Sequence, residues 1–238
     1  MTETKSKPKR RLSDVPKPVA KRYWRRRTGP AAKAIARRLM RLRLPKMERA
    51  RVKALEAAFE TTKHYAIKNE HGSFPAVKLF MNIGLYLLIA ARDIQALKID
   101  ALTHPDEWTR KLNARIILLT IYEWDADKVT GRQLREAFDI VQAPESLRTR
   151  TVEVLRDLRL VQRKVAKEFL FVRNAAIAHR DPDALVQYRA IQDLSVEKVF
   201  VAAGDFFAAV DSFMPVLTNL MQISSSFPIL LREWKEKP

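Results

Sequence analysis

The chain has 238 residues, of which 47% are hydrophobic, so it can bury a sizeable core in one or two domains. It contains only five glycines and no cysteine, which disfavours a turn-rich β-fold and excludes disulfides, thiolate metal sites and cysteine nucleophiles. The net charge of +18 is concentrated at one end: residues 1–54 hold 20 Lys and Arg against three acids, and the remainder is nearly neutral. This asymmetry favours a polyanionic partner, either RNA, DNA or anionic lipid.

Residues 1–30 are predicted to be a disordered basic arm, because prolines and cations recur there with almost nothing to bury. Within the arm, two aromatic side chains adjoin three guanidinium groups, a mixture that can stack on bases while neutralising phosphates. These candidate nucleic-acid contacts are Tyr23, Trp24, Arg25, Arg26 and Arg27. The alternative is a solubilising tail whose aromatic side chains dock on the body.

Residues 31–44 are predicted to form a basic amphipathic helix that ends before Pro45, since proline interrupts a helix interior. Ile35, Leu39 and Leu42 recur at helical spacing on one face. The cations assigned to nucleic-acid binding are Lys33, Arg37, Arg38 and Arg41. The sequence leaves open whether this helix meets an RNA groove, a membrane surface, a partner's groove or the body of its own chain.

Residues 45–238 are predicted to form one all-α domain, a helical bundle. Apolar residues at three- and four-residue steps predict helices over about 47–69, 75–99, 103–124, 130–141, 145–181 and 193–223. Trp108 and Trp124 fall where core side chains are expected. The most apolar run, 79–91, is too short to cross a bilayer of about 30 Å, so no transmembrane segment is expected. With no secretory signal visible, the expected location is cytoplasmic.

The stretch with the most chemistry is 171–182, Phe-Val-Arg-Asn-Ala-Ala-Ile-Ala-His-Arg-Asp-Pro. An imidazole moves protons near neutral pH, and fixed cations beside it can stabilise a developing oxyanion. No second histidine lies at metal-ligand spacing and no phosphate-binding glycine loop occurs, so neither a metal nor a cofactor is expected. The candidate site residues are Arg173, Asn174 and His179, supported by Arg180 and Asp181.

Arg173-Asn174 followed by four residues and His179, near the end of a long helix, resembles the Arg-x4–6-His signature of the HEPN-domain superfamily. The continuation through Arg180 and Asp181 is most similar to the abortive-infection subgroup of that superfamily. The resemblance implies a metal-independent endoribonuclease of defence or toxin type. It further implies a homodimer whose two motifs face one cleft, with an antitoxin or another defence partner.

The resemblance also implies a role for each residue. Arg173 would hold the scissile phosphate and Asn174 would support it. His179 would move the proton during attack by the RNA 2′-hydroxyl, which leaves a 2′,3′-cyclic phosphate. Arg180 would grip the backbone, and Asp181 would orient the imidazole.

Two features of the motif leave alternatives open. Residues six apart on an α-helix are separated by about 120° and about 9 Å, so Arg173 and His179 do not share a face. They meet either because the arginine side chain curls back or, as we favour, across a two-fold axis. Alternatively, His179 merely complements the helix dipole and Arg173 pairs with Glu168. The protein would then be a non-catalytic nucleic-acid-binding or scaffold protein that uses the basic arm.

Overall fold

A computed structural model describes residues 29–72, 74–130, 133–177 and 181–235 of the chain. The regular elements in these ranges are all helical and no strand occurs among them, so the predicted all-α class is confirmed. In chain order they are α2 (Pro30–Lys68), α3 (Pro75–Thr103), α4 (Glu107–Glu123), α5 (Ala126–Thr130), α6 (Gln133–Ile140), α7 (Glu145–Glu168), α8 (Leu170–Val172), the π-helical turn η2 (Arg173–Ile177), α9 (Ala184–Gln192), α10 (Val196–Ser224) and α11 (Phe227–Lys235).

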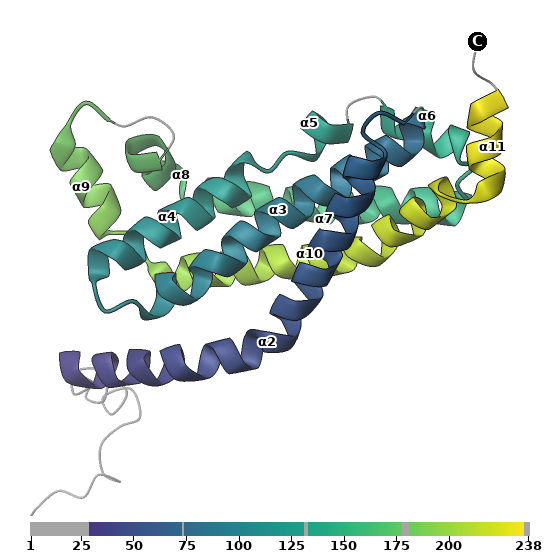
Figure 1. The fold of residues 1–238 in the computed structure, drawn as a ribbon. Coiled ribbons are helices and arrows are strands. Elements are labelled where there is room, and N and C mark those ends of the chain that lie inside the picture. Colours follow the sequence, from purple (N-terminus) through teal and green to yellow (C-terminus); the bar gives the residue numbers. More distant parts are fainter. Residues whose placement is uncertain (1–28, 73, 131–132, 178–180, 236–238) are drawn as a thin grey trace, which may run out of the picture.

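The main core lies between the long helices α3, α4, α7 and α10, which run side by side, with α2 packed along α3 (Figure 1). Large side chains from each of them are sealed from solvent, including Phe80, Ile121, Leu158 and Phe206. Trp124, as predicted, is also buried, and its ring stacks on Tyr86 with centroids 6.1 Å apart. Removing this apolar surface from water is the dominant force that assembles the bundle.

The close packing of three helices depends on Gly84 in the middle of α3. A Cβ atom at this position would collide with Met221 of α10 and would lie 3.3 Å from Thr62 of α2. The missing side chain therefore lets both neighbouring helices approach α3 at this level. In the described part of the chain, α10 alone is long and apolar enough to cross a membrane, and half of its most apolar window is buried inside the fold.

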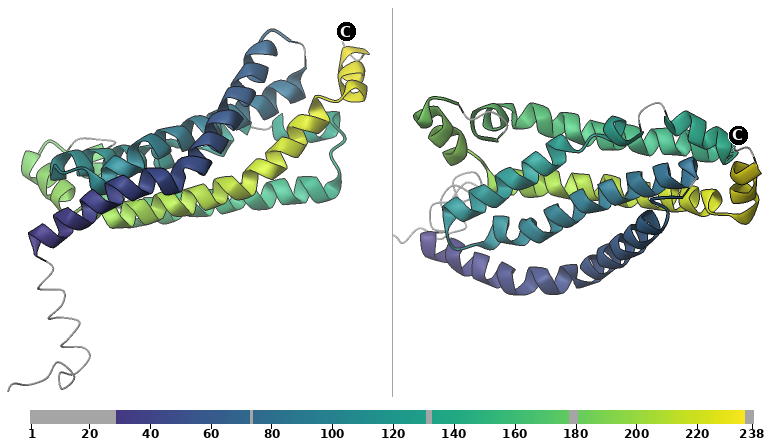
Figure 2. Two further views of the ribbon diagram at one scale, coloured as in Figure 1. Left: turned by 60° about the horizontal axis from the view of Figure 1, so that its bottom comes forward. Right: turned by 45° about the horizontal axis from the view of Figure 1, so that its top comes forward.

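The prediction that a helix ends before Pro45 is wrong, because α2 runs unbroken from Pro30 to Lys68 with Pro45 inside it. The predicted boundary between residues 44 and 45 therefore falls within one helix. An internal proline removes one backbone hydrogen bond and crowds the preceding turn, which bends a helix that is held elsewhere. Here Leu55 and Thr62 anchor the second half of α2 against the body, and the helix bends along its course (Figure 1, Figure 2).

A matched pair of leucines on α7 tests the assignment of its buried face. Leu158 is 0% exposed, whereas Leu160, two residues later, is 53% exposed. We expect Leu158→Ala to lower the free energy of unfolding by about 2–5 kcal/mol, because it leaves a cavity in the core. Leu160→Ala is expected to change it by less than about 0.5 kcal/mol. Urea denaturation followed by circular dichroism measures both, and equal losses would contradict the packing described.

Candidate active site

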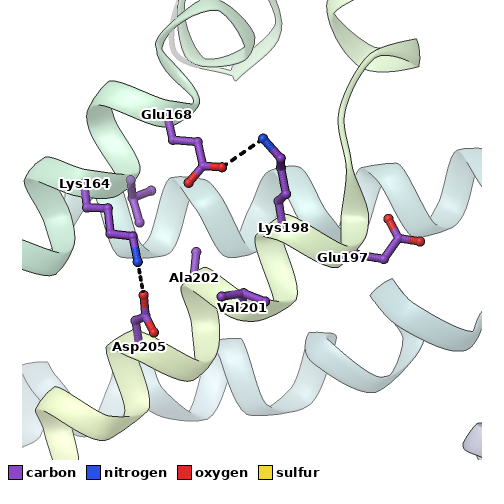
Figure 3. Close-up of a pocket in the computed structure, with 8 residues that line it drawn as sticks. Lys164, Glu168, Glu197, Lys198, Val201, Ala202 and Asp205 are labelled. Carbon is purple, nitrogen blue, oxygen red and sulfur yellow. Dashed lines mark hydrogen bonds and ion pairs between the residues drawn. The ribbon is translucent and has the colours of Figure 1, made fainter. Parts of the chain in front are cut away.

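Two ion pairs fasten the end of α7 to the start of α10, immediately before the motif. Lys164 Nζ lies 2.6 Å from a carboxylate oxygen of Asp205, and Lys198 Nζ lies 3.2 Å from one of Glu168, across a pocket of about 220 Å³ (Figure 3). The hydrogen bond to Asp205, together with its negative charge, raises the pKa of Lys164. Among the described residues Glu168 forms an ion pair with Lys198 and none with Arg173, so the alternative pairing of Arg173 with Glu168 is not found.

The predicted helix from residue 145 to the motif is interrupted, which is a correction to the sequence analysis. α7 ends at Glu168, the buried Phe169 departs from helical geometry with φ −112° and ψ 20°, and a short turn of α8 follows. The chain then enters the π-helical turn η2 at Arg173. Angular separations calculated for an α-helix therefore do not apply within the motif. Single π-helical turns are frequent at functional sites.

Arg173, the first residue of this turn, is held against α4. Its guanidinium carbon lies 3.9 Å from the centroid of the Tyr122 ring, a close cation–π contact. The side chain is half-buried, and its Nε atom is buried without a hydrogen-bond partner among the described residues. A buried donor of this kind costs free energy unless something pairs with it, and a cation fixed in place is suited to an anionic ligand.

A second, small apolar core fixes η2 to the helix that follows it. Ala175 and Ala176 of η2 are buried against Ala190 and Ile191 of α9, with Val186 packed beside them. This packing explains why only small and apolar residues follow Asn174 in the motif. It leaves Asn174 exposed on a shallow pocket of about 470 Å³, whose lining also includes Lys167, Phe171 and Asp181.

Asp181 shapes the turn into α9. Its backbone N–H donates to the carbonyl oxygen of Ala175 at 3.1 Å, and its carboxylate accepts the N–H of Asp183 at 2.8 Å. Asp183 in turn caps α9 by accepting the N–H of Leu185 at 2.8 Å. The structure thus gathers Arg173, Asn174 and Asp181 around one turn.

The remaining motif residues, His179 and Arg180, lie outside the described residues. The sequence joins His179 to Ile177 and to Asp181 by two peptide bonds each. Both of those neighbours are described: Ile177 is the last residue of η2, and Asp181 lies between η2 and α9.

The cations predicted on the first helix occupy the beginning of α2. Lys33, Arg38 and Arg41 are exposed, and Arg41 lies 3.7 Å from Asp100 of α3. Arg37 is half-buried beside α4: burial lowers the pKa of Arg110 there, and the positive charge of Arg37 lowers it further. The start of α2 and the α8–α9 segment lie at one end of the bundle, on either side of the α3–α4 turn (Figure 1). The arm residues Tyr23, Trp24, Arg25, Arg26 and Arg27 lie outside the described residues.

An exposed apolar stripe on α4, next to Tyr122, is not predicted from the sequence. The prediction that Trp108 belongs to the core is wrong, since this side chain is 47% exposed. The other exposed members follow it at i+4, i+8 and i+11 and are Leu112, Ile116 and Leu119. A helical spacing of apolar residues is the same for a core face and a docking face, so only burial distinguishes them.

No family model, curated protein or solved structure matches this chain.

Replacing the ring of Tyr122 tests whether its contact with Arg173 contributes to stability. We expect Tyr122→Leu to lower the free energy of unfolding by about 1 kcal/mol or more, because leucine offers no π-face to the guanidinium and is smaller than tyrosine. Tyr122→Phe keeps that face and should lie within about 0.5 kcal/mol of the wild type. Chemical denaturation of the three proteins provides the comparison, and identical values for Leu and Phe would show that the ring does not hold Arg173.

Proposed function

We propose that this protein is a metal-independent endoribonuclease of the HEPN type, active in defence or as a toxin in the cytoplasm. The observation that carries the proposal is the fixed guanidinium of Arg173, stacked on Tyr122 with an unpaired buried Nε, beside the exposed Asn174. A pre-oriented cation next to an open polar side chain is suited to binding a phosphodiester. The sequence supplies the required imidazole five residues after Asn174, as His179.

In this proposal each residue acts on one part of the phosphodiester. Arg173 binds a non-bridging phosphate oxygen and stabilises the charge that grows there in the transition state, and Asn174 donates a further hydrogen bond. His179 accepts the proton of the 2′-hydroxyl as its oxygen attacks phosphorus, or donates a proton to the departing 5′-oxygen. The products are a 2′,3′-cyclic phosphate and a free 5′-hydroxyl. Arg180 grips the adjoining phosphate, and Asp181 orients the imidazole.

A cationic surface that leads to the site supports an RNA substrate. Arg156, Arg163 and Lys167 are exposed on the outer side of α7, and none forms an ion pair with a described residue. They span twelve residues, or about 16 Å of helix, and Lys167 lines the same pocket as Asn174. Most other cations of this helix are paired, for example Arg159 with Asp127. With the cations of the arm and of α2, this surface would neutralise the phosphates of a strand.

The exposed stripe on α4 supports a homodimer. Trp108, Leu112, Ile116 and Leu119 lie on the helix whose Tyr122 holds Arg173. If two copies meet along this stripe across a two-fold axis, the arginine of each copy comes close to the motif of the other. Such a composite site would bring Arg173 and His179 together across the interface.

A nucleic-acid-binding or scaffold protein without catalysis is the alternative. The exposed cations of α2 favour it, because Lys33 and Arg38 can contact phosphates without any contribution from Arg173. Catalysis therefore has to be measured separately from binding. An antitoxin or defence partner would fit either alternative.

Cleavage of a mixed RNA pool in EDTA tests the proposal. We expect the wild type to cleave without metal, His179→Ala to be slower by about 10²–10⁴-fold, and Arg173→Ala by about 10²–10³-fold. The cleaved ends are expected to carry 2′,3′-cyclic phosphates. His71→Ala, which removes an exposed imidazole in the turn after α2, serves as the matched control and should cleave at the wild-type rate.

The proposal is rejected if His179→Ala retains full activity or if cleavage requires added metal. RNA binding without cleavage by the wild type would favour the non-catalytic alternative. Circular dichroism of every variant shows whether its helical fold is intact.

The pairing of two copies is tested by placing charge on the α4 stripe. We expect the double substitution Leu112→Glu/Ile116→Glu to convert a dimer into a monomer, because two pairs of carboxylates would face each other across the axis. Leu160→Glu, on the exposed side of α7, should leave the dimer intact. Light scattering after size exclusion gives the mass, and a wild-type monomer at all concentrations would rule out a composite site.

A further inference from the structure

The first half of α2 exposes an apolar stripe to solvent. Ile35 is 61% exposed, Leu39 48% and Leu42 64%, and their i, i+4, i+7 spacing places them on one face. Contiguous exposed aliphatic side chains at a helical spacing are typical of a surface that meets another apolar surface. Of the four partners that the sequence leaves open for this helix, the body of its own chain does not cover the apolar face.

In an ordinary surface helix the apolar face points to the body and the polar face to solvent, whereas here the aliphatic face points to solvent. Its half-buried residues, Arg37, Leu44 and Glu48, follow one another at i, i+7 and i+11 on the side opposite Ile35. Polar contacts hold this side to the body: Glu48 accepts a hydrogen bond of 2.6 Å from the buried Lys98 of α3. The aliphatic side thus faces outward because the charged side is already engaged.

Exposed cations border the stripe on both sides. On a helical projection Arg38 lies about 60° to one side of Ile35 and Arg43 about 80° to the other, with Lys46 continuing the stripe. All three are exposed, and no described acid forms an ion pair with them. Arginine and lysine in this position can lay their aliphatic stems beside the stripe while their charges reach outward.

We propose that this half of α2 lies on the surface of an anionic lipid bilayer. Ile35, Leu39 and Leu42 would enter the boundary between headgroups and acyl chains, and Arg38 and Arg43 would contact the phosphates. Stable attachment requires a second signal besides a short apolar face, and residues 1–28 supply eleven further Lys and Arg in the sequence. This inference is independent of the proposed ribonuclease activity.

Two other occupants fit the geometry less well. An RNA strand would neutralise the cations but leave the three aliphatic side chains in water, so it does not account for the stripe. A second copy of the chain would bring the cations bordering each stripe close together, which repulsion opposes. An anionic bilayer satisfies both the charge and the apolar surface.

Vesicle flotation with the full chain tests the proposal. Vesicles of phosphatidylcholine alone are compared with vesicles containing about one quarter phosphatidylglycerol, which attract basic segments. We expect the wild type to float only with the anionic vesicles. The triple variant Ile35→Gln/Leu39→Gln/Leu42→Gln keeps every charge and should bind at least about ten-fold more weakly. Val152→Gln/Leu160→Gln, on the exposed face of α7, should bind like the wild type.

Insertion of the stripe can be observed directly, because the chain contains no cysteine. A single Leu42→Cys variant carrying an environment-sensitive fluorophore should shift its emission to the blue on anionic vesicles. The same label at Leu160→Cys should remain in water. Since the cations are shared, excess RNA is expected to displace the wild type from the vesicles.

Several results would overturn the proposal. Equal binding of the triple variant and the wild type would mean that charge alone attaches the protein. A change of oligomeric state in the triple variant without lipid would assign the stripe to a second copy, and an equal loss of RNA affinity would assign it to RNA. Loss of RNA cleavage in His179→Ala, with vesicle binding unchanged, separates this inference from the proposed ribonuclease.

Discussion

The stacking of the Arg173 guanidinium on the Tyr122 ring is the contact on which the candidate site depends. It joins the motif to α4, a helix that is buried in the core along its other side through Ala114, Ile117 and Ile121. A charged side chain on a short π-helical turn would otherwise sample many rotamers, and fixing it in advance lowers the entropy lost when an anion binds. The stacking on a core helix therefore restricts the motion of the Arg173 guanidinium.

The segment around the motif has a different construction from the bundle that carries it. The bundle is held by large apolar side chains such as Trp124 and Phe206, whereas η2 and α9 meet through alanines and a single isoleucine. A small core of this kind buries little apolar area and contributes correspondingly little free energy. The ion pairs between α7 and α10 lie just before this weaker segment, and the Asp183 cap begins α9 within it.

Two apolar helix faces, one on α4 and one on α2, are exposed to solvent instead of being buried in the bundle. The stripe on α4 lies beside the candidate site, and the stripe on α2 lies among unpaired cations at the same end of the molecule. We propose a second copy of the chain as the partner of the α4 stripe and an anionic bilayer as the partner of the α2 stripe. The described cations at the start of α2 therefore lie beside the second of these stripes.

The sequence by itself determined the all-α class, the buried position of Trp124 and the concentration of charge at the N-terminal end, because periodicity and composition report which segments bury one face. Tertiary structure alone decided that α2 continues through Pro45 instead of ending before it, since packing of Leu55 and Thr62 offsets the lost hydrogen bond. Tertiary structure also decided that Trp108 and Ile35 are exposed to solvent. A helical repeat of apolar residues predicts an apolar face but does not indicate which neighbouring element, if any, covers that face. The break at Phe169 and the π turn after it are likewise not visible in the helical repeat, because the π turn packs on Tyr122 of α4 and on α9, and a local pattern does not contain such contacts between helices.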